Sequence, residues 1–175
     1  HFYKEEDLKI EAPELSLYEY MMEVTKEYKN NCAINYFGKK ITFKLFWEYI
    51  DKCARAFKSL GVREGDVVTI CMPNTPEAAI SFFAANKIGA ITTFLNYRAS
   101  KNEIKDYLNL FESPIFVNFD KDNEYNEEIK RDTKVRNIIT LDKKDLYNKE
   151  FNEKEKNVLY GYSDFITFND LGIIS

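Results

Sequence analysis

The chain has 175 residues, of which 45% are hydrophobic and 31% are charged, and its formal net charge is −4. This length and composition fit one domain with a well-filled core, and the acidic balance gives no electrostatic basis for binding a nucleic-acid backbone. The apolar stretches are too short for the ~20 residues that a helix needs to cross a membrane. We therefore expect neither a nucleic-acid partner nor a membrane span.

The first predicted helix follows a polar segment, residues 1–15, which we expect to be a lead-in arm. Ser16 and Glu19 have the spacing of a capping box, in which each side chain bonds an otherwise unpaired N–H. The apolar residues of this helix recur at helical spacing: Leu17, Met21, Val24 and Tyr28. Beyond it, residues 32–37 and 39–43 lie on either side of a glycine and predict two short strands or a hairpin.

A second helix is predicted from Thr42, whose hydroxyl can cap it, to Gly61, which can supply a left-handed stop. The apolar side of this helix comprises Phe46, Ile50, Cys53 or Ala54, Phe57 and Leu60. Residues 67–72 then form an apolar run with no polar alternation beyond Thr69. Such a run is typical of a strand that is buried on both faces of a parallel sheet.

The next helix is predicted to begin at Thr75, a good N-cap, with Pro76 in its first position. Glu77 suits the positive end of that helix. Its apolar side comprises Ala79, Phe82, Phe83 and Ile88. Gly89 ends the helix, and residues 90–95 are predicted as the next strand.

Ser100 and Glu103 repeat the capping-box spacing. The residues that follow at helical spacing are Ile104, Tyr107, Leu108 and Phe111. Strands are predicted at 115–119 and 137–141, on either side of a weaker helix near 123–131. The charged stretch 142–157 predicts a surface loop or a short helix.

Alternating strands and helices predict an α/β fold, with a largely parallel sheet flanked by helices in βαβ units and a short N-terminal helix and hairpin before it. Residues 16–175 are taken as a single α/β subdomain. Ligands of such folds bind beyond the carboxyl ends of the strands. Residues 73–75 lie at one of these ends, so this turn could line a cleft, although spacing alone favours an ordinary turn.

No catalytic constellation is evident, and we predict no catalytic and no metal-binding residue; cofactor-binding residues stay unknown. His1 is the only histidine, so Ser-His-Asp and Cys-His catalysis have no internal base. A calcium loop is suggested by the spacing of three acidic residues, Asp120, Asp122 and Glu124. Tyr125 and Arg131 occupy the positions where that loop needs Gly and Glu, and we reject it.

Cysteine usage points to a reducing compartment. Cys32, Cys53 and Cys71 are odd in number and lie within apolar segments, where cysteine behaves as a small hydrophobe. The sequence holds no C-x-x-C pair and no N-x-[ST] glycosylation sequon. These features favour a cytoplasmic protein over a secreted disulfide scaffold.

An ordered series of segments resembles the N-terminal part of the adenylate-forming enzymes, a superfamily that includes the AMP-forming acyl-CoA synthetases. The resemblance runs from about Leu17 to Val117 and is carried by the stretches LSLYEYM, ITFKLFWEYIDKCARAFKSLGV, REGDVV, TICMPNTPEAAISFFAANKIGAI and FLNYRASKNEIKDYLNLFESPIFV. The Leu-Asn-x-Arg form of residues 95–98 looks more like the acyl-CoA synthetases than the peptide-synthetase adenylation domains. Residues 142–175 match no part of the family that we can place.

The resemblance implies an acid–thiol ligase that joins a small carboxylic acid to coenzyme A, as in fatty acid metabolism, with ATP and Mg²⁺. The family's phosphate loop, its aromatic-Thr-Glu segment, its ribose-binding Asp and its C-terminal Lys all lie downstream of the matched region, so the subdomain is expected to be incomplete, inactive by itself and without a bound cofactor. Family positions recur at Asp66, Pro73, Asn74 and Glu77. We interpret these four as scaffold, with Asp66 fixing the turn into the strand and Asn74 the turn out of it.

Two alternatives stay open. The chain could be a naturally short, non-catalytic binding or interaction module, or, with less support, an unrelated flavodoxin-like domain. If it is an incomplete subdomain, apolar surface should be left exposed where further chain packs, and self-association through that surface is expected.

Overall fold

The structure is a computed structural model, and it describes residues 13–119, 121–141 and 166–167. The elements in chain order are α1 (Leu17–Thr25), a short 3₁₀ helix (Lys26–Tyr28), β1 (Cys32–Tyr36), β2 (Lys39–Thr42), α2 (Phe43–Ser59), β3 (Val67–Cys71), α3 (Pro76–Lys87), β4 (Ile91–Phe94), α4 (Lys101–Leu110), β5 (Ile115–Phe119), α5 (Asn123–Asp132), β6 (Asn137–Leu141) and β7 (Ile166–Thr167). Most of the predicted lead-in arm and the charged stretch 142–157 lie outside the described residues.

The main sheet has the strand order β4-β3-β5-β6-β7, and every neighbouring pair is parallel. This confirms the predicted α/β class. The strands expected at 115–119 and 137–141 have the bounds of β5 and β6. The two-residue strand β7 was not predicted.

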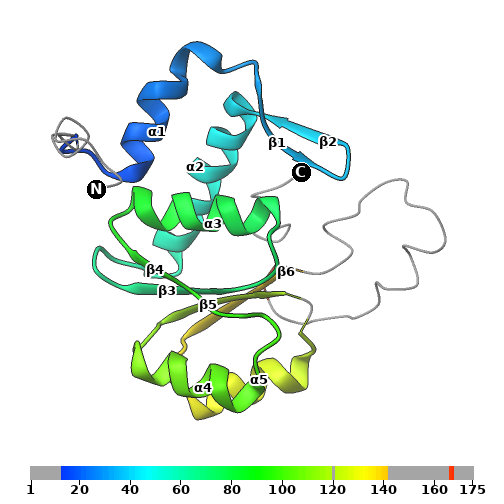
Figure 1. Ribbon diagram of the computed structural model, residues 1–175. Helices are drawn as coiled ribbons and strands as arrows, with labels where there is room; N and C mark the ends of the chain where they lie inside the picture. Colours follow the sequence, from blue (N-terminus) through cyan, green and yellow to red (C-terminus); the bar gives the residue numbers. More distant parts are fainter. Residues whose placement is uncertain (1–12, 120, 142–165, 168–175) are drawn as a thin grey trace, which may run out of the picture.

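Helices cover both faces of this sheet, as Figure 1 shows: α2 and α3 lie on one face, and α4 and α5 lie on the other. Val68 and Ile70 point into the larger core, beneath α2 and α3, whereas Cys71 and Phe116 point into the smaller core beneath α4 and α5. Because both faces are covered, the apolar surface expected of an incomplete subdomain is not a bare sheet face. The large exposed apolar side chains of the elements lie on α1, the 3₁₀ helix, β4 and α4: Leu17, Tyr20, Val24, Tyr28, Ile91, Phe94, Tyr107 and Leu110.

The caps predicted for the first three helices are present. Ser16 and Glu19 make both bonds of the capping box, with the Ser16 hydroxyl accepting from the Glu19 N–H at 3.2 Å and the Glu19 carboxylate accepting from the Ser16 N–H at 2.8 Å. Thr42 caps α2 by accepting from the Leu45 N–H at 3.3 Å. Gly61 follows α2 with φ = 84°, the left-handed conformation that stops a helix.

Only half of the second capping box forms, at α4. The Ser100 hydroxyl accepts from the Glu103 N–H at 3.3 Å, but Glu103 is exposed and its carboxylate returns no bond to Ser100 within the described residues. One of the two bonds is sufficient to define the first turn of the helix.

The packed side of α1 differs from the one that helical spacing suggested. Leu17, Val24 and Tyr28 are exposed, and the residues that pack on the larger core are Tyr18, Met21 and Met22. The Tyr18 N–H donates to Asn86 Oδ1 at 2.7 Å, so a polar contact with α3 fixes the rotation of α1. The predicted apolar series was therefore wrong except for Met21, and the contact with the neighbouring helix decides which side of α1 is buried.

The apolar side predicted for α3 also needs correction. Its four residues are only half-buried, and the fully buried side is formed by small or branched residues: Ala78, Ile80, Ser81, Ala84 and Ala85. Helix α3 lies between the sheet, α2 and α1, so nearly all of its circumference is in contact with protein. Small side chains on the buried side let α3 lie close to α2 and the sheet, whereas Phe82 and Phe83 line the groove with the hairpin and Phe94 of β4.

The three cysteines differ in burial. Cys53 and Cys71 are buried, as expected for small hydrophobes, whereas Cys32 is exposed. Cys32 begins β1, which pairs with β2 in the hairpin, and its own side chain is exposed although Ala33, Ile34 and Tyr36 of the same strand pack against the larger core.

Candidate functional site

A groove of about 510 Å³ lies at the carboxyl end of β3, where the chain turns into α3. Its walls come from the β1–β2 hairpin, the β3–α3 turn, α3 and the end of β4. The side chains that define it include Tyr36, Asn74, Thr75, Phe82, Phe83 and Phe94. The turn at 73–75 therefore lines a concave surface at the edge of the sheet where α/β folds bind ligands.

Thr75 holds the turn that forms the floor of this groove. Its hydroxyl oxygen accepts from the Ala78 N–H at 3.3 Å and its O–H donates to the Met72 sulfur at 3.6 Å. Pro76 occupies the first helical position, where no N–H is needed. Asn74 was expected to fix this turn, but its exposed side chain makes no hydrogen bond with the described residues, and Thr75 has that role instead.

An aromatic layer forms the apolar wall. The Phe82 ring lies 5.2 Å from Phe83 and 5.9 Å from Phe94 between centroids. Phe83 in turn meets Trp47 of α2 edge-to-face at 5.9 Å. Such pairs stabilise by about 0.5–1.5 kcal/mol beyond their buried area, so the wall is anchored to the core and holds its shape.

The groove is suited to binding and not to acid–base chemistry. Among the described residues that line it, none is a carboxylate, lysine or arginine, and the polar side chains are the amides of Asn35 and Asn74 and the hydroxyls of Tyr36 and Thr75. Glu77, which we expected only to complement the helix end, is 6% exposed. The pKa of the Tyr49 hydroxyl on α2 is raised, mainly by burial and to a smaller degree by the negative charges of Glu48 and Glu77. An apolar acyl or aryl group is the kind of ligand that this lining can contact.

Asp66 has the scaffold role that we inferred for it. Its Oδ2 accepts from the Arg63 N–H at 2.8 Å, and its own N–H donates to the Arg63 carbonyl at 3.1 Å. The guanidinium of Arg136 lies 3.9 Å from the same carboxylate oxygen. These contacts fix the turn into β3 at the end of the strand opposite the groove.

A row of buried polar side chains crosses the carboxyl edge of the sheet on its other face. Cys71, Asn118 and Thr140 are register partners on β3, β5 and β6. Asn118 Nδ2 donates to Asn126 Oδ1 of α5 at 2.7 Å, and Asn126 Nδ2 donates to Thr140 Oγ1 at 3.2 Å. This row was not predicted from the sequence, although an asparagine within the apolar strand IFVNF was a signal for it.

The thiol in this row is not an activated nucleophile. Burial raises the pKa of Cys71 to about 11, with a smaller opposing effect from the charge of Lys121. Since the thiolate is the reactive form, Cys71 is unreactive at neutral pH. Burial also raises the pKa of Tyr125, whose ring lies between Lys101 and Lys121 at 5.6 Å and 4.9 Å. The Cys71 thiol and the Tyr125 hydroxyl therefore have a structural role in the packing beside this row and do not form a catalytic pair.

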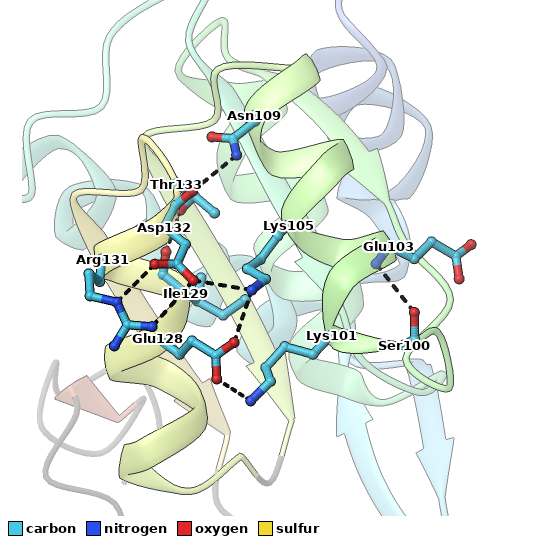
Figure 2. A network of polar contacts seen from close by, with 10 residues as sticks. All are labelled: Ser100, Lys101, Glu103, Lys105, Asn109, Glu128, Ile129, Arg131, Asp132 and Thr133. Atoms are coloured by element: carbon cyan, nitrogen blue, oxygen red, sulfur yellow. Dashed lines mark hydrogen bonds and ion pairs between the residues drawn. The ribbon is translucent and has the colours of Figure 1, made fainter.

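An ionic network joins α4 to α5 over the smaller core (Figure 2). Glu128 is paired with Lys101 and lies 2.9 Å from Lys105, which is also 3.1 Å from Asp132. Asn109 Nδ2 donates to the Asp132 carbonyl at 3.1 Å. Lys101 first, and then Lys105, lowers the pKa of the Glu128 carboxyl. Every charge in this network has a partner, so its evident role is to hold the two helices together.

Two of the acidic residues whose spacing suggested a calcium loop, Asp122 and Glu124, lie at the start of α5. The Asp122 carboxylate accepts from the Tyr125 N–H at 2.8 Å as the N-cap of α5, and Glu124 lies in the first turn. Asp120 lies outside the described residues. Among those that are described, no three His, Cys, Asp or Glu side chains are grouped so as to hold a metal ion. Nor does any helix there combine the length and apolar character needed to cross a bilayer.

The fold and groove define an α/β domain whose concave surface lies at the carboxyl edge of a parallel sheet. A family model described as "AMP-binding enzyme" matches residues 22–164. The chain belongs to the AMP-binding enzyme family, which confirms the resemblance to adenylate-forming enzymes. The match continues beyond Val117, so the expectation that residues 142–175 have no counterpart in the family is wrong for residues 142–164.

Relatives and solved structures agree with this family. Acetyl-coenzyme A synthetase 1 of Saccharomyces cerevisiae is 36% identical over 87 residues, which are 49% of this chain and 12% of that protein. The anthranilate CoA ligase AuaEII, solved with anthranoyl-AMP, has a TM-score of 0.72 at 19% identity over 90% of this chain and 27% of its own. A second solved structure, a putative long-chain-fatty-acid CoA ligase of Rhodopseudomonas palustris, has a TM-score of 0.71 at 20% identity. The match covers 90% of this chain and 36% of that one. The chain thus spans a small share of each relative, and the structural likeness shows the fold.

Proposed function

We propose that this chain is the N-terminal part of an ATP-dependent, AMP-forming acid–thiol ligase. In that reaction a carboxylate oxygen attacks the α-phosphorus of ATP and releases pyrophosphate, leaving an acyl-adenylate. The sulfur of coenzyme A then attacks the acyl carbonyl, and AMP leaves. The family match over residues 22–164 carries the proposal, and the similarity to acetyl-coenzyme A synthetases supports a thioester product.

The chain's own contribution is to build one wall of the substrate cleft. The aromatic groove beyond β3 would contact the apolar part of the acid, while Thr75 and Asp66 fix the two ends of the strand that positions it. The Mg²⁺ that neutralises the developing phosphate charge would be held by residues of the longer protein. By itself the chain is expected to be inactive. A cytoplasmic location is consistent with its free cysteines.

Pyrophosphate release by the protein encoded by the complete gene, measured with a broad panel of carboxylic acids, tests the activity. We expect pyrophosphate release that depends on both an acid and ATP. If no acid of the panel gives pyrophosphate release, the proposal is contradicted. In that protein, Ala79→Trp, which fills the groove, should raise KM for the acid. Ala33→Trp, on the hairpin outside the groove lining, is the matched control. Calorimetry should detect no specific ATP binding to residues 1–175, and micromolar binding would mean that the nucleotide site lies within them.

A second candidate is a self-standing, non-catalytic binding module. The observation in its favour is that helices cover both faces of the sheet, so the described residues form their own core. The reading frame separates the two candidates. A gene that ends near residue 175 supports the module, and one that continues into a Gly-rich loop with Lys supports the ligase.

A further inference from the structure

Strand β4 is the outer strand of the main sheet, and within the described residues it pairs only with β3. Two of its four residues are large exposed apolar side chains, with Ile91 57% exposed and Phe94 55% exposed. We propose that this edge pairs, antiparallel, with the same edge of a second copy of the chain. The inference is independent of the ligase activity proposed above.

The backbone of β4 presents unused hydrogen-bonding groups at this edge. The Ile91 N–H donates to the Asp66 carbonyl and the Leu95 N–H donates to the Ile70 carbonyl, each at 2.9 Å, so both residues face β3. Backbone groups alternate along a strand, and Thr92 and Phe94 therefore direct their N–H and C=O groups away from β3. No other described strand accepts or donates there.

One register satisfies both the hydrogen bonds and the side-chain faces. With a two-fold axis through Thr93, Thr92 lies opposite Phe94 of the second copy, and the two residues exchange both backbone bonds. Thr93 then faces its own symmetry mate in a non-hydrogen-bonded pair. Ile91 lies opposite Leu95 of the second copy on the face of α4 and α5. In each pair the partners lie on the same face of the continued sheet, as antiparallel pairing requires.

Self-complementarity supports a second copy as the occupant, because one two-fold register uses the same outward-facing Thr92 and Phe94 backbone groups on both strands. Residues 90–95, AITTFL, contain no charge and no proline, the features with which natural edge strands prevent such pairing.

Light scattering coupled to gel filtration, over a concentration series of residues 1–175, tests the association. The mass should rise to that of two chains, and Ile91→Lys should return it to one. Leu110→Lys is the matched control, because Leu110 is 71% exposed on α4 and has an isomeric side chain. A single-chain mass at every concentration, or equal loss of association in the two variants, would overturn the proposal. Circular dichroism verifies that each variant is folded.

Cysteine cross-linking tests the register in a Cys32→Ser background, which removes the exposed thiol. Thr93→Cys places two thiols in a non-hydrogen-bonded antiparallel pair, a separation that a disulfide can span. Thr92→Cys places them at a diagonal distance of about 7–8 Å, which is too far. Rapid covalent pairing of the first variant alone is expected. Equal pairing of both, or pairing of neither, would rule out this register.

Discussion

Asn118 of β5 and Asn126 of α5 are joined by a 2.7 Å hydrogen bond between side chains that are both fully buried. Asn126 extends the contact to Thr140 of β6 at 3.2 Å. One amide therefore ties a helix to two strands at the carboxyl edge of the sheet. Buried polar groups are costly unless they are bonded, so this amide helps to determine where α5 lies on the sheet.

Replacing that amide should be costly. Asn126→Ala leaves Asn118 Nδ2 and Thr140 Oγ1 without their bonds to it, and a loss of about 2 kcal/mol or more in the free energy of unfolding is expected. Urea denaturation measures it. Asn102→Ala, at an exposed position of α4, should change stability by less than about 0.5 kcal/mol. Equal effects of the two changes would show that the buried bonds contribute little.

The Asp66 turn gives a second prediction. Asp66→Ala removes the acceptor of the Arg63 N–H and should destabilise the chain by about 1 kcal/mol. Asp66→Asn retains an oxygen at that position and should recover most of the loss. The same denaturation measurement applies. If alanine and asparagine behave alike, the charge of Asp66 and not its hydrogen bond is what stabilises the turn.

The ionic network of α4 and α5 should make stability depend on pH in acid. The pKa of Glu128 is lowered in the folded chain, so its stabilising effect is complete above its ordinary pKa of 4.5 and is lost as pH falls through the lower folded value. Glu128→Gln should flatten the stability profile below about pH 4.5. The profile can be followed by thermal melts in low salt. Glu23→Gln, on the exposed side of α1, is the control and should leave the profile unchanged.

Thiol labelling should distinguish the three cysteines. At pH 8 a maleimide should react quickly with Cys32 alone, because Cys53 and Cys71 are buried and their pKa values are raised by that burial. Cys32→Ser should abolish rapid labelling, and denaturant should expose the other two thiols. Mass spectrometry counts the labels. Rapid reaction at Cys71 in the folded chain would contradict its packing beneath α4 and α5.

Much of the fold could be predicted because local physics defines it. The caps at Ser16, Thr42 and Thr75 satisfy N–H groups within a few residues, and apolar runs such as 115–119 and 137–141 are buried wherever the sheet places them. The position of the turn at 73–75, at the carboxyl end of a parallel strand, followed from the same alternation of elements. The family could be inferred because its segments occur in order along the chain.

The sequence by itself determined where the described helices and most of the strands begin and end, because capping, apolar periodicity and turn residues act over a few positions. Only the tertiary structure decided which side of α1 and α3 is buried, that Thr75 and not Asn74 fixes the turn, and that Asn126 bridges two strands. Those outcomes depend on partners far away in sequence, and spacing along one segment contains no information about the partner that it meets.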